Sequence, residues 1–203
     1  KASMTLPRTL GPAILLLTAL TIGAEQAPKG QVDPQAKYEP RSSPGAGQQF
    51  LQKFVGDWDV VKTFHPRSGE PVRMTGQCRQ AMIHDGRFLQ CEFTFDHAGT
   101  KTTGLGIVGY EVDSGRFTSV WTDSRSTRMS LRQSQDKFTG EEIVLYGRSL
   151  NDGARTPART RTVTRLEDDG RKLVHRQYLI GAEGKERLMM ELLMTKKAKA
   201  AEK

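Results

Sequence analysis

Apolar and polar side chains alternate along most of the chain, from Trp58 to Met194. A period of two residues is typical of β-strands that bury one face and expose the other. Clusters of Gly, Asp, Asn, Ser and Pro, which form tight turns, separate the alternating segments. The pattern predicts about ten strands, at residues 58–65, 72–83, 88–95, 105–111, 116–123, 127–134, 137–149, 158–166, 172–180 and 186–195. Because no helical segment intervenes, we expect an all-β antiparallel meander that closes into an up-and-down barrel, with two packed sheets as the alternative.

A short helix is predicted directly before the first strand. The segment Gln48–Val55 carries apolar residues with the spacing of one helix face, at Phe50, Leu51, Phe54 and Val55. Such a helix has an apolar side to bury, so we expect it to pack against the barrel.

The interior of the barrel is expected to be mixed in polarity. On the first strand, Trp58, Val60 and Phe64 share a face with Lys62. On the last strand, the alternation puts four apolar residues on one face, at Leu188, Met190, Leu192 and Met194. Several other strands place Thr, Ser, Tyr or His at alternating positions. This composition predicts an interior that is wetter than a fatty-acid pocket.

Composition divides the chain into four segments. Residues 1–24 predict a signal peptide, and residues 25–47, rich in Pro, Gly, Gln and Ser, predict a flexible leader. Residues 48–196 form the single expected barrel domain, and residues 197–203 a basic, disordered tail.

The signal-peptide prediction depends on an apolar run at residues 13–22, which follows Arg8 and precedes the small residues Gly23 and Ala24. Such a run is short for a bilayer core of about 30 Å. A retained anchor is therefore the less favoured alternative. We expect an exported protein, periplasmic or extracellular, without a stable membrane span after cleavage.

The chain is basic, with 31 Lys and Arg against 23 Asp and Glu. Removing residues 1–24 deletes Lys1 and Arg8 and no acid, which lowers the net charge from +8 to +6. The basic residues are scattered along the strands, and they do not alternate with exposed aromatics as on nucleic-acid platforms. We therefore expect a solvated surface and no nucleic-acid partner. No pattern indicates an oligomeric state.

Two cysteines, Cys78 and Cys91, flank a predicted hairpin with an Asp85-Gly86 turn. A two-residue loop would place Cys78 opposite Phe93 and Cys91 opposite Gln80. The cysteines are then diagonal neighbours, about 7–8 Å apart, beyond the usual reach of a disulfide. We expect two buried thiols, with a disulfide as the alternative.

Three stretches together resemble a known family: Gly56-Asp57-Trp58, Met82–Leu89, and Gly104–Tyr110 followed by Phe117–Thr127. The first is similar to the G-x-W signature of lipocalin-like, or calycin, barrels, whose Trp packs at the closed end. Their order over residues 48–196 resembles a mostly bacterial, secreted family catalogued only as a domain of unknown function. The resemblance implies a lipocalin-like barrel of about ten strands. It transfers no catalytic residue. Glu111, where the family pattern has Asp, is a departure that concerns only a turn.

The segment from Asp123 to Thr127, together with Trp121, is the main candidate for ligand binding. It combines a carboxylate, hydroxyls including that of Ser124, and an indole ring. Ligand pockets combine apolar walls with a few convergent polar groups. We expect Trp121 to stack on a ligand at the barrel mouth, while Asp123 and Ser124 form hydrogen bonds with that ligand. The alternative is a tight turn in which Asp and Ser satisfy backbone groups.

Three further residues are candidates for ligand contact. Tyr110 could stack on the ligand, and Arg87 could reach an anion or pair with Asp123 across the rim, although a structural role in the turn is favoured for Arg87. His175 is predicted to point into the interior. A hydrogen-bonded barrel histidine is favoured there over a haem ligand.

No enzyme signature occurs in the sequence, because the nucleophile elbow, the P-loop and the dinucleotide fingerprint are all missing. The histidines and cysteines show no metal-ligand spacing. We therefore expect no metal or cofactor and predict a binder of a small organic ligand. The alternatives are an interaction module with a barrel filled by side chains, and a hydrolase that uses the Asp123–Thr127 cluster with Ser124 near His175.

Overall fold

The computed structural model describes residues 34–39, 41–148, 159–181 and 183–198. The chain divides into two compact units, Lys1–Arg41 and Ser42–Lys203. In the first unit, the amide groups of Tyr38 and Glu39 both donate to the carbonyl oxygen of Gln35, at 2.8 Å, and form a turn. The predicted signal peptide lies outside the described residues. No helix in the described part of the chain is long and apolar enough to cross a membrane.

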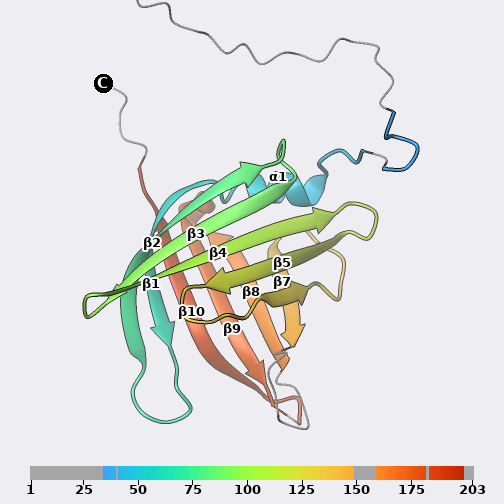
Figure 1. The fold of residues 1–203 in the computed structure, drawn as a ribbon. Coiled ribbons are helices and arrows are strands. Elements are labelled where there is room, and N and C mark those ends of the chain that lie inside the picture. The colour runs from blue at the N-terminus through green and yellow to red at the C-terminus, as the bar shows by residue number, and fades with distance from the viewer. Residues whose placement is uncertain (1–33, 40, 149–158, 182, 199–203) are drawn as a thin grey trace, which may run out of the picture. The chain divides into compact units, whose positions relative to one another are not determined.

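The second unit is a closed barrel of ten strands in meander order, preceded by a short helix (Figure 1). Each strand is antiparallel to its neighbours, and β1 pairs with β10 to close the ring. The elements are α1 Ala46–Gln52, β1 Gly56–Phe64, β2 Val72–Ile83, β3 Phe88–His97, β4 Thr100–Glu111, β5 Arg116–Asp123, β6 Ser130–Gln133, β7 Glu142–Arg148, β8 Arg159–Glu167, the 3-10 turn η1 Asp168–Gly170, β9 Lys172–Ile180 and β10 Glu186–Lys196. The predicted fold class is confirmed.

Strands β6 and β7 are shorter than the alternation predicts. The sequence pattern starts a strand at residue 127, whereas β6 begins at Ser130. Side-chain caps hold the preceding residues in a turn, because Asp123 accepts from the Arg125 amide at 2.9 Å and Ser126 accepts from the Arg128 amide at 3.1 Å. Local hydrogen bonds of this kind compete with a sheet ladder.

A β-bulge in β10 corrects the predicted inward face of that strand. The register with β9 shifts between Leu188 and Met190, so Leu188 lies opposite Tyr178 while Met190 lies opposite Gln177. A one-residue insertion moves all side chains on one side of it to the other face. Met190, Leu192 and Met194 point inward as predicted, but Leu188 does not.

Helix α1 packs against one end of the barrel and completes its core there (Figure 1). Leu51 and Trp58 are fully buried, and Phe54 is nearly so. The indole nitrogen of Trp58 donates to the carbonyl oxygen of Phe54 at 2.9 Å. The apolar residues of the helix and of the alternating strands thus form one cluster, to which Trp58 of the G-x-W stretch belongs.

The two cysteines have the predicted register and are free thiols. Cys78 pairs with Phe93, and Cys91 with Gln80. Three consecutive turn residues, His84, Asp85 and Gly86, have positive φ, at 51°, 53° and 78°, and the Arg87 amide donates to the carbonyl oxygens of Ile83 and His84. Burial raises the pKa of Cys78 strongly and that of Cys91 to about 12. Both thiols are therefore protonated at neutral pH.

Candidate functional site

The inward-facing side chains differ between the two ends of the barrel. We call the end next to α1 the capped half, which contains Trp58, Val60, Phe117 and Met194, all at most 1% exposed. We call the other end the distal half, which contains the buried rings of Phe93 and Phe95. Its inward-facing residues also include six with charged, polar or large apolar side chains, at Lys62, Met74, Trp121, Asp123, Arg132 and His175. All six are half-buried. These residues lie on the inward faces of their strands. The exposed part of each side chain therefore faces the barrel interior or the open end of the distal half.

Trp121 is held in one orientation against the barrel wall. Its Nε1 donates to Asp123 Oδ2 at 3.0 Å, while Asp123 Oδ1 accepts from the backbone amide of Arg125. The Trp121 ring covers Gly104, where an added Cβ would lie 2.4 Å from the ring. Phe93 packs edge-on against the same ring, with 5.5 Å between the ring centroids. A side chain fixed in this way offers a preorganised surface, which loses little conformational freedom on binding.

Inward-facing glycines recur beneath other large side chains of the distal half. A Cβ at Gly76 would lie 2.5 Å from the ring of Phe95, and one at Gly147 would lie 2.9 Å from Cγ of Arg132. Glycine permits close approach because it lacks a side chain. Phe95 and Arg132 therefore lie close to the backbone of the wall at these points, as Trp121 does.

Two of the cations that face the interior of the distal half, Lys62 and Arg132, have no carboxylate partner among the described residues. The ammonium group of Lys62, on β1, lies 5.0 Å from the ring centre of Phe95, and burial and the charge of Arg125 lower its pKa against the opposing effect of Asp123. Arg132, on β6, lies opposite Ser119 and Gly147, and burial lowers its pKa. Neither forms an ion pair within 4 Å with a carboxylate among the described residues.

His175 adds a neutral polar group to this interior. Its Nδ1 lies 2.8 Å from Oγ1 of Thr164, a hydrogen-bond distance. Burial, and to a smaller extent the charge of Arg132, lower the pKa of His175 to about 4. The imidazole is therefore uncharged at neutral pH. Within the described residues, no three His, Cys, Asp or Glu side chains form a cluster that could hold a metal ion.

Two predicted site residues lie in the capped half, away from Trp121. Arg87 follows the β2–β3 turn, where it donates to the carbonyl oxygens of His84 and Ser42 and lies 3.5 Å from the carboxylate of Asp85. The suggested pairing of Arg87 with Asp123 across the rim is wrong, because β3 begins at the capped end and β5 ends at the distal one.

The ring of Tyr110 packs on that of Phe117, with 4.9 Å between the ring centroids. Tyr110 also lies against Gly47 of α1, where an added Cβ would lie 2.1 Å from the Tyr110 ring. The structure therefore places Tyr110 in the aromatic core of the capped half and not at the barrel mouth.

The catalytic arrangement required for hydrolysis does not form. Ser124 Oγ accepts a hydrogen bond from the backbone amide of Thr103 at 3.0 Å, whereas the partner of His175 is Thr164. Trp121, Asp123 and Ser124 are close together as the sequence indicates, but Ser124 satisfies a backbone group and His175 does not contact it.

Arg132 and the glycines beneath the large side chains were missed by the sequence analysis. Alternation could have placed Arg132 inward together with Ser130, but the sequence pattern set the strand boundaries wrongly in this region. Lys62 was placed on the inward face, although no role was predicted for it. The three glycines lie on inward faces, a position where glycine often marks a close approach of another group.

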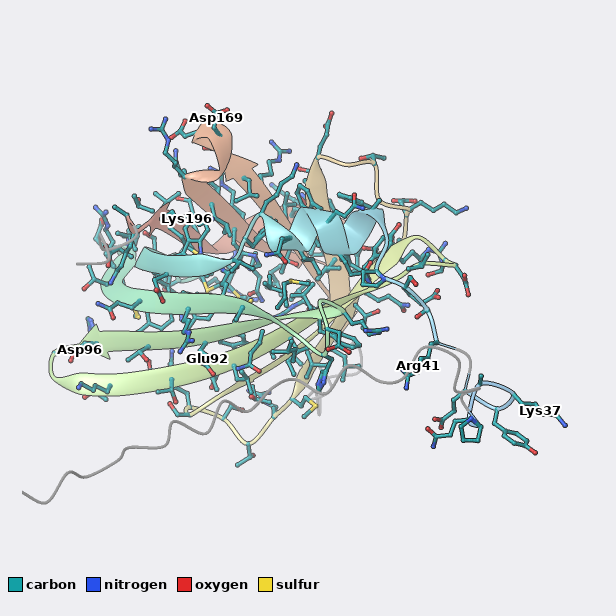
Figure 2. The ribbon with its side chains drawn as sticks, turned by 90° about the horizontal axis from the view of Figure 1, so that it is seen from above. Lys37, Arg41, Glu92, Asp96, Asp169 and Lys196 are labelled. Atoms are coloured by element: carbon teal, nitrogen blue, oxygen red, sulfur yellow. The ribbon has the colours of Figure 1, made fainter. Side chains whose placement is uncertain are left out.

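Two hollows on the outer surface provide a contrast with this interior. A groove of about 990 Å³ beside β1–β3 is lined by charges of both signs, including Asp57, Arg79, Glu92 and Lys196. Figure 2 labels Glu92 and Lys196 there. A smaller hollow of about 110 Å³ lies over β8 and β9 and is lined by Arg161, Arg165 and Arg176.

Each of the three arginines over β8 and β9 has a glutamate partner. Arg161 forms two hydrogen bonds with Glu186, Arg165 pairs with Glu142, and Arg176 pairs with Glu191 at 2.6 Å. The charges on this outer surface are balanced, in contrast to those of the distal interior.

Comparison with known proteins shows solved structures with a similar fold and one family whose sequence profile matches. No curated protein matches it. Among solved structures, "Crystal Structure of Rv2717c from M. tuberculosis" is similar over 77% of this chain and 100% of that chain, at 15% identity and a TM-score of 0.56. Identity this low supports the fold alone. A phycobiliprotein lyase, CPES from Guillardia theta, is similar over 76% of this chain and 94% of its own, at 9% identity and a TM-score of 0.49, which supports no inference about function. The sequence profile of the family described as "Protein of unknown function (DUF1579)" matches residues 43–196, and the chain therefore belongs to the DUF1579 family.

Proposed function

We propose that the protein binds a small organic ligand inside the distal half of the barrel. The observation that carries this proposal is the fixed, half-buried Trp121 ring, which faces the interior and is held by Asp123 and by the close fit to Gly104. Phe93 adds apolar surface beside this ring, and Arg132, which lies on the adjacent strand β6 opposite Ser119, adds a polar group to the same interior. Sites for small molecules combine such walls with a few placed polar groups.

Native mass spectrometry of the protein purified from its own host tests this proposal. We expect a mass excess that is present in the folded protein and disappears on denaturation. The variant Trp121→Ala should lose this excess because the stacking surface is removed. Thr122→Ala is the matched control, since Thr122 is the next residue of β5 and faces outward. Loss of the excess in both variants, or in neither, would count against a role for Trp121.

Export from the cytoplasm is the second part of the proposal. It is supported by the apolar run at residues 13–22 with its flanking Arg8 and small residues. Fractionation of the host followed by intact-mass measurement tests it. We expect to find the protein outside the cytoplasm, with the mass of a chain from which residues 1–24 have been removed. A membrane-bound protein that keeps residues 1–24 would support the anchor instead.

The competing candidate is an interaction module whose barrel is filled by side chains. Exposed apolar residues on the outside of β4–β6 favour it, since Leu105 is 40% and Leu131 53% exposed. In that case a hydrophobic probe would bind the outer surface and leave the interior unperturbed.

A further inference from the structure

We infer that the ligand of the distal half is a small amphipathic anion, with an aromatic or otherwise apolar body and one carboxylate, sulfonate or phosphate group. This inference rests on the proposed function and adds the charge and chemical class of the ligand. It is carried by the unequal number of cations and anions that face the interior.

The inward faces of the described strands carry one carboxylate in the distal half, that of Asp123. Both of its oxygens already accept hydrogen bonds, from Trp121 Nε1 and from the Arg125 amide. The interior cations are Lys62 and Arg132, for which no carboxylate within 4 Å is found in the described part of the barrel. A third inward cation, Arg187, donates to the carbonyl oxygens of His65 and Pro66 and is thereby occupied.

This imbalance is costly for the unliganded protein. A charged group that loses water without gaining a partner destabilises the folded state. On the outer wall of the same barrel, Arg161, Arg165 and Arg176 each have a glutamate partner. These outward-facing arginines of β8 and β9 have carboxylate partners, whereas Arg132, which faces the interior, has none among the described residues. An anionic ligand would supply the missing partner.

The arrangement of the cations fits a ligand that lies within the barrel. Strands β1 and β6 are five places apart in either direction around the ring of ten, so Lys62 and Arg132 project from opposite walls. Trp121, Phe93 and Phe95 form an aromatic wall on β3 and β5, with Phe93 and Phe95 stacked at 5.8 Å. An apolar body can contact this wall while its anionic group approaches the guanidinium of Arg132 or the ammonium of Lys62.

Two fluorescent probes of nearly the same shape test the inference. Anilinonaphthalene sulfonate carries a negative charge, and N-phenylnaphthylamine is its uncharged counterpart. Both are titrated into the wild-type protein and into Arg132→Met and Lys62→Met, with Arg73→Met as the control, because Arg73 lies on β2 and is exposed. Thermal unfolding of each variant verifies that it is folded.

We expect Arg132→Met and Lys62→Met to weaken binding of the sulfonate probe by roughly tenfold or more, since hydrogen bonds to charged groups are the stronger class. Binding of the neutral probe should change by less than about twofold, and Arg73→Met should affect neither probe. If a Met variant does not fold, Ser130→Asp provides a second route. It retains Arg132 and adds a carboxylate two residues away on the same face of β6, so it should also weaken the sulfonate probe selectively.

The outcomes separate the two proposals. Selective loss of the sulfonate probe supports the anion inference. Equal weakening of both probes, or no weakening of either, overturns it while leaving ligand binding in place. If neither probe is affected by Trp121→Ala, the proposed binding in the distal half fails, and the anion inference fails with it.

Discussion

The two halves of the barrel are built from the same strands but differ in what their inward side chains do. In the capped half, Trp58, Phe117 and Leu51 are at most 1% exposed and pack around α1. In the distal half, the rings of Phe93 and Phe95 are buried, but many inward-facing residues are only half-buried, and these include cations, a carboxylate and a histidine. A single strand such as β5 contributes Phe117 to one half and Trp121 to the other.

The difference indicates a division between stability and binding. Dense apolar packing contributes most of the favourable free energy of folding. Unpaired charges in the interior reduce this free energy, and proteins retain them where they contribute to a binding site. The apolar packing of the capped half thus stabilises the whole barrel. The charged side chains inside the distal half lower that stability. Each of the following changes should affect one half more than the other.

The largest effect on stability is expected from truncation of the two tryptophans. Trp58→Ala should destabilise the protein by about 3–5 kcal/mol, because it removes a fully buried ring and leaves a cavity. Trp121→Ala should cost only about 1–2 kcal/mol, because its ring is partly exposed. Urea denaturation of both variants measures the free energies of unfolding. Equal losses would contradict the proposed division.

Acid should destabilise the distal half through His175. The imidazole pKa is about 4 in the folded protein and near 6.5 in the unfolded chain. Between pH 6.5 and 4 the unfolded state therefore binds a proton that the folded state does not, so stability falls as the pH is lowered through this window. The loss is at most about 3 kcal/mol.

Stability measured from pH 7 to pH 4 checks this prediction. His175→Gln should reduce the acid-dependent loss, whereas His97→Gln, at an exposed position, should leave it unchanged. An identical pH profile for the wild type and His175→Gln would show that another group is responsible.

Adding a methyl group at Gly104, directly beneath the Trp121 ring, should disturb the distal half more than the capped half. In Gly104→Ala the new Cβ would lie 2.4 Å from the ring, so the ring must move, at a cost of about 1–3 kcal/mol. Binding of the neutral naphthylamine probe should weaken. Gly181→Ala is the control, because its nearest contact would be an ordinary 3.6 Å. Unchanged probe binding in Gly104→Ala would show that the Trp121 orientation is unimportant.

Removal of an interior cation should stabilise the unliganded protein slightly. Arg132→Met replaces a half-buried, unpaired charge by an apolar side chain, and the gain should be about 1 kcal/mol. Arg73→Met at the surface should change stability by less than about 0.5 kcal/mol. Denaturation of ligand-free protein measures both. A loss of stability in Arg132→Met would indicate that Arg132 has a structural role.

The smallest effect is expected at the two buried thiols. Because burial raises the pKa values of Cys78 and Cys91, neither thiolate forms at neutral pH. A thiol reagent such as iodoacetamide should modify neither cysteine in the native protein and both after unfolding, as read by mass spectrometry. Rapid modification of native Cys91 would show that this side of the barrel opens.

The fold could be predicted from the sequence because alternation and turn residues act locally. The bounds of β2, β5 and β9 were predicted to the residue, and the Asp85-Gly86 turn set the register that separates the two cysteines. The bulge at Leu188–Met190 could not be predicted, since an inserted residue leaves no local signal in an apolar segment.

The site was harder to predict because it depends on which strands face one another. Trp121 and Asp123 are two residues apart, so their contact follows from alternation on one strand. Arg87 and Tyr110 were grouped with them wrongly, because a list of polar and aromatic residues does not say at which end of the barrel each lies. The opposition of Lys62 and Arg132 requires the closed ring of strands.

Methionine methyl resonances provide the most direct test of ligand binding in the distal interior. Met74 and Met190 face the interior there, Met194 is buried in the capped half, and Met129 is 54% exposed on the outside. With methyl-labelled methionine and added N-phenylnaphthylamine, we expect the Met74 and Met190 signals to shift while those of Met129 and Met194 stay in place. A shift of Met129 alone, with Met74 and Met190 unchanged, would contradict binding inside the barrel.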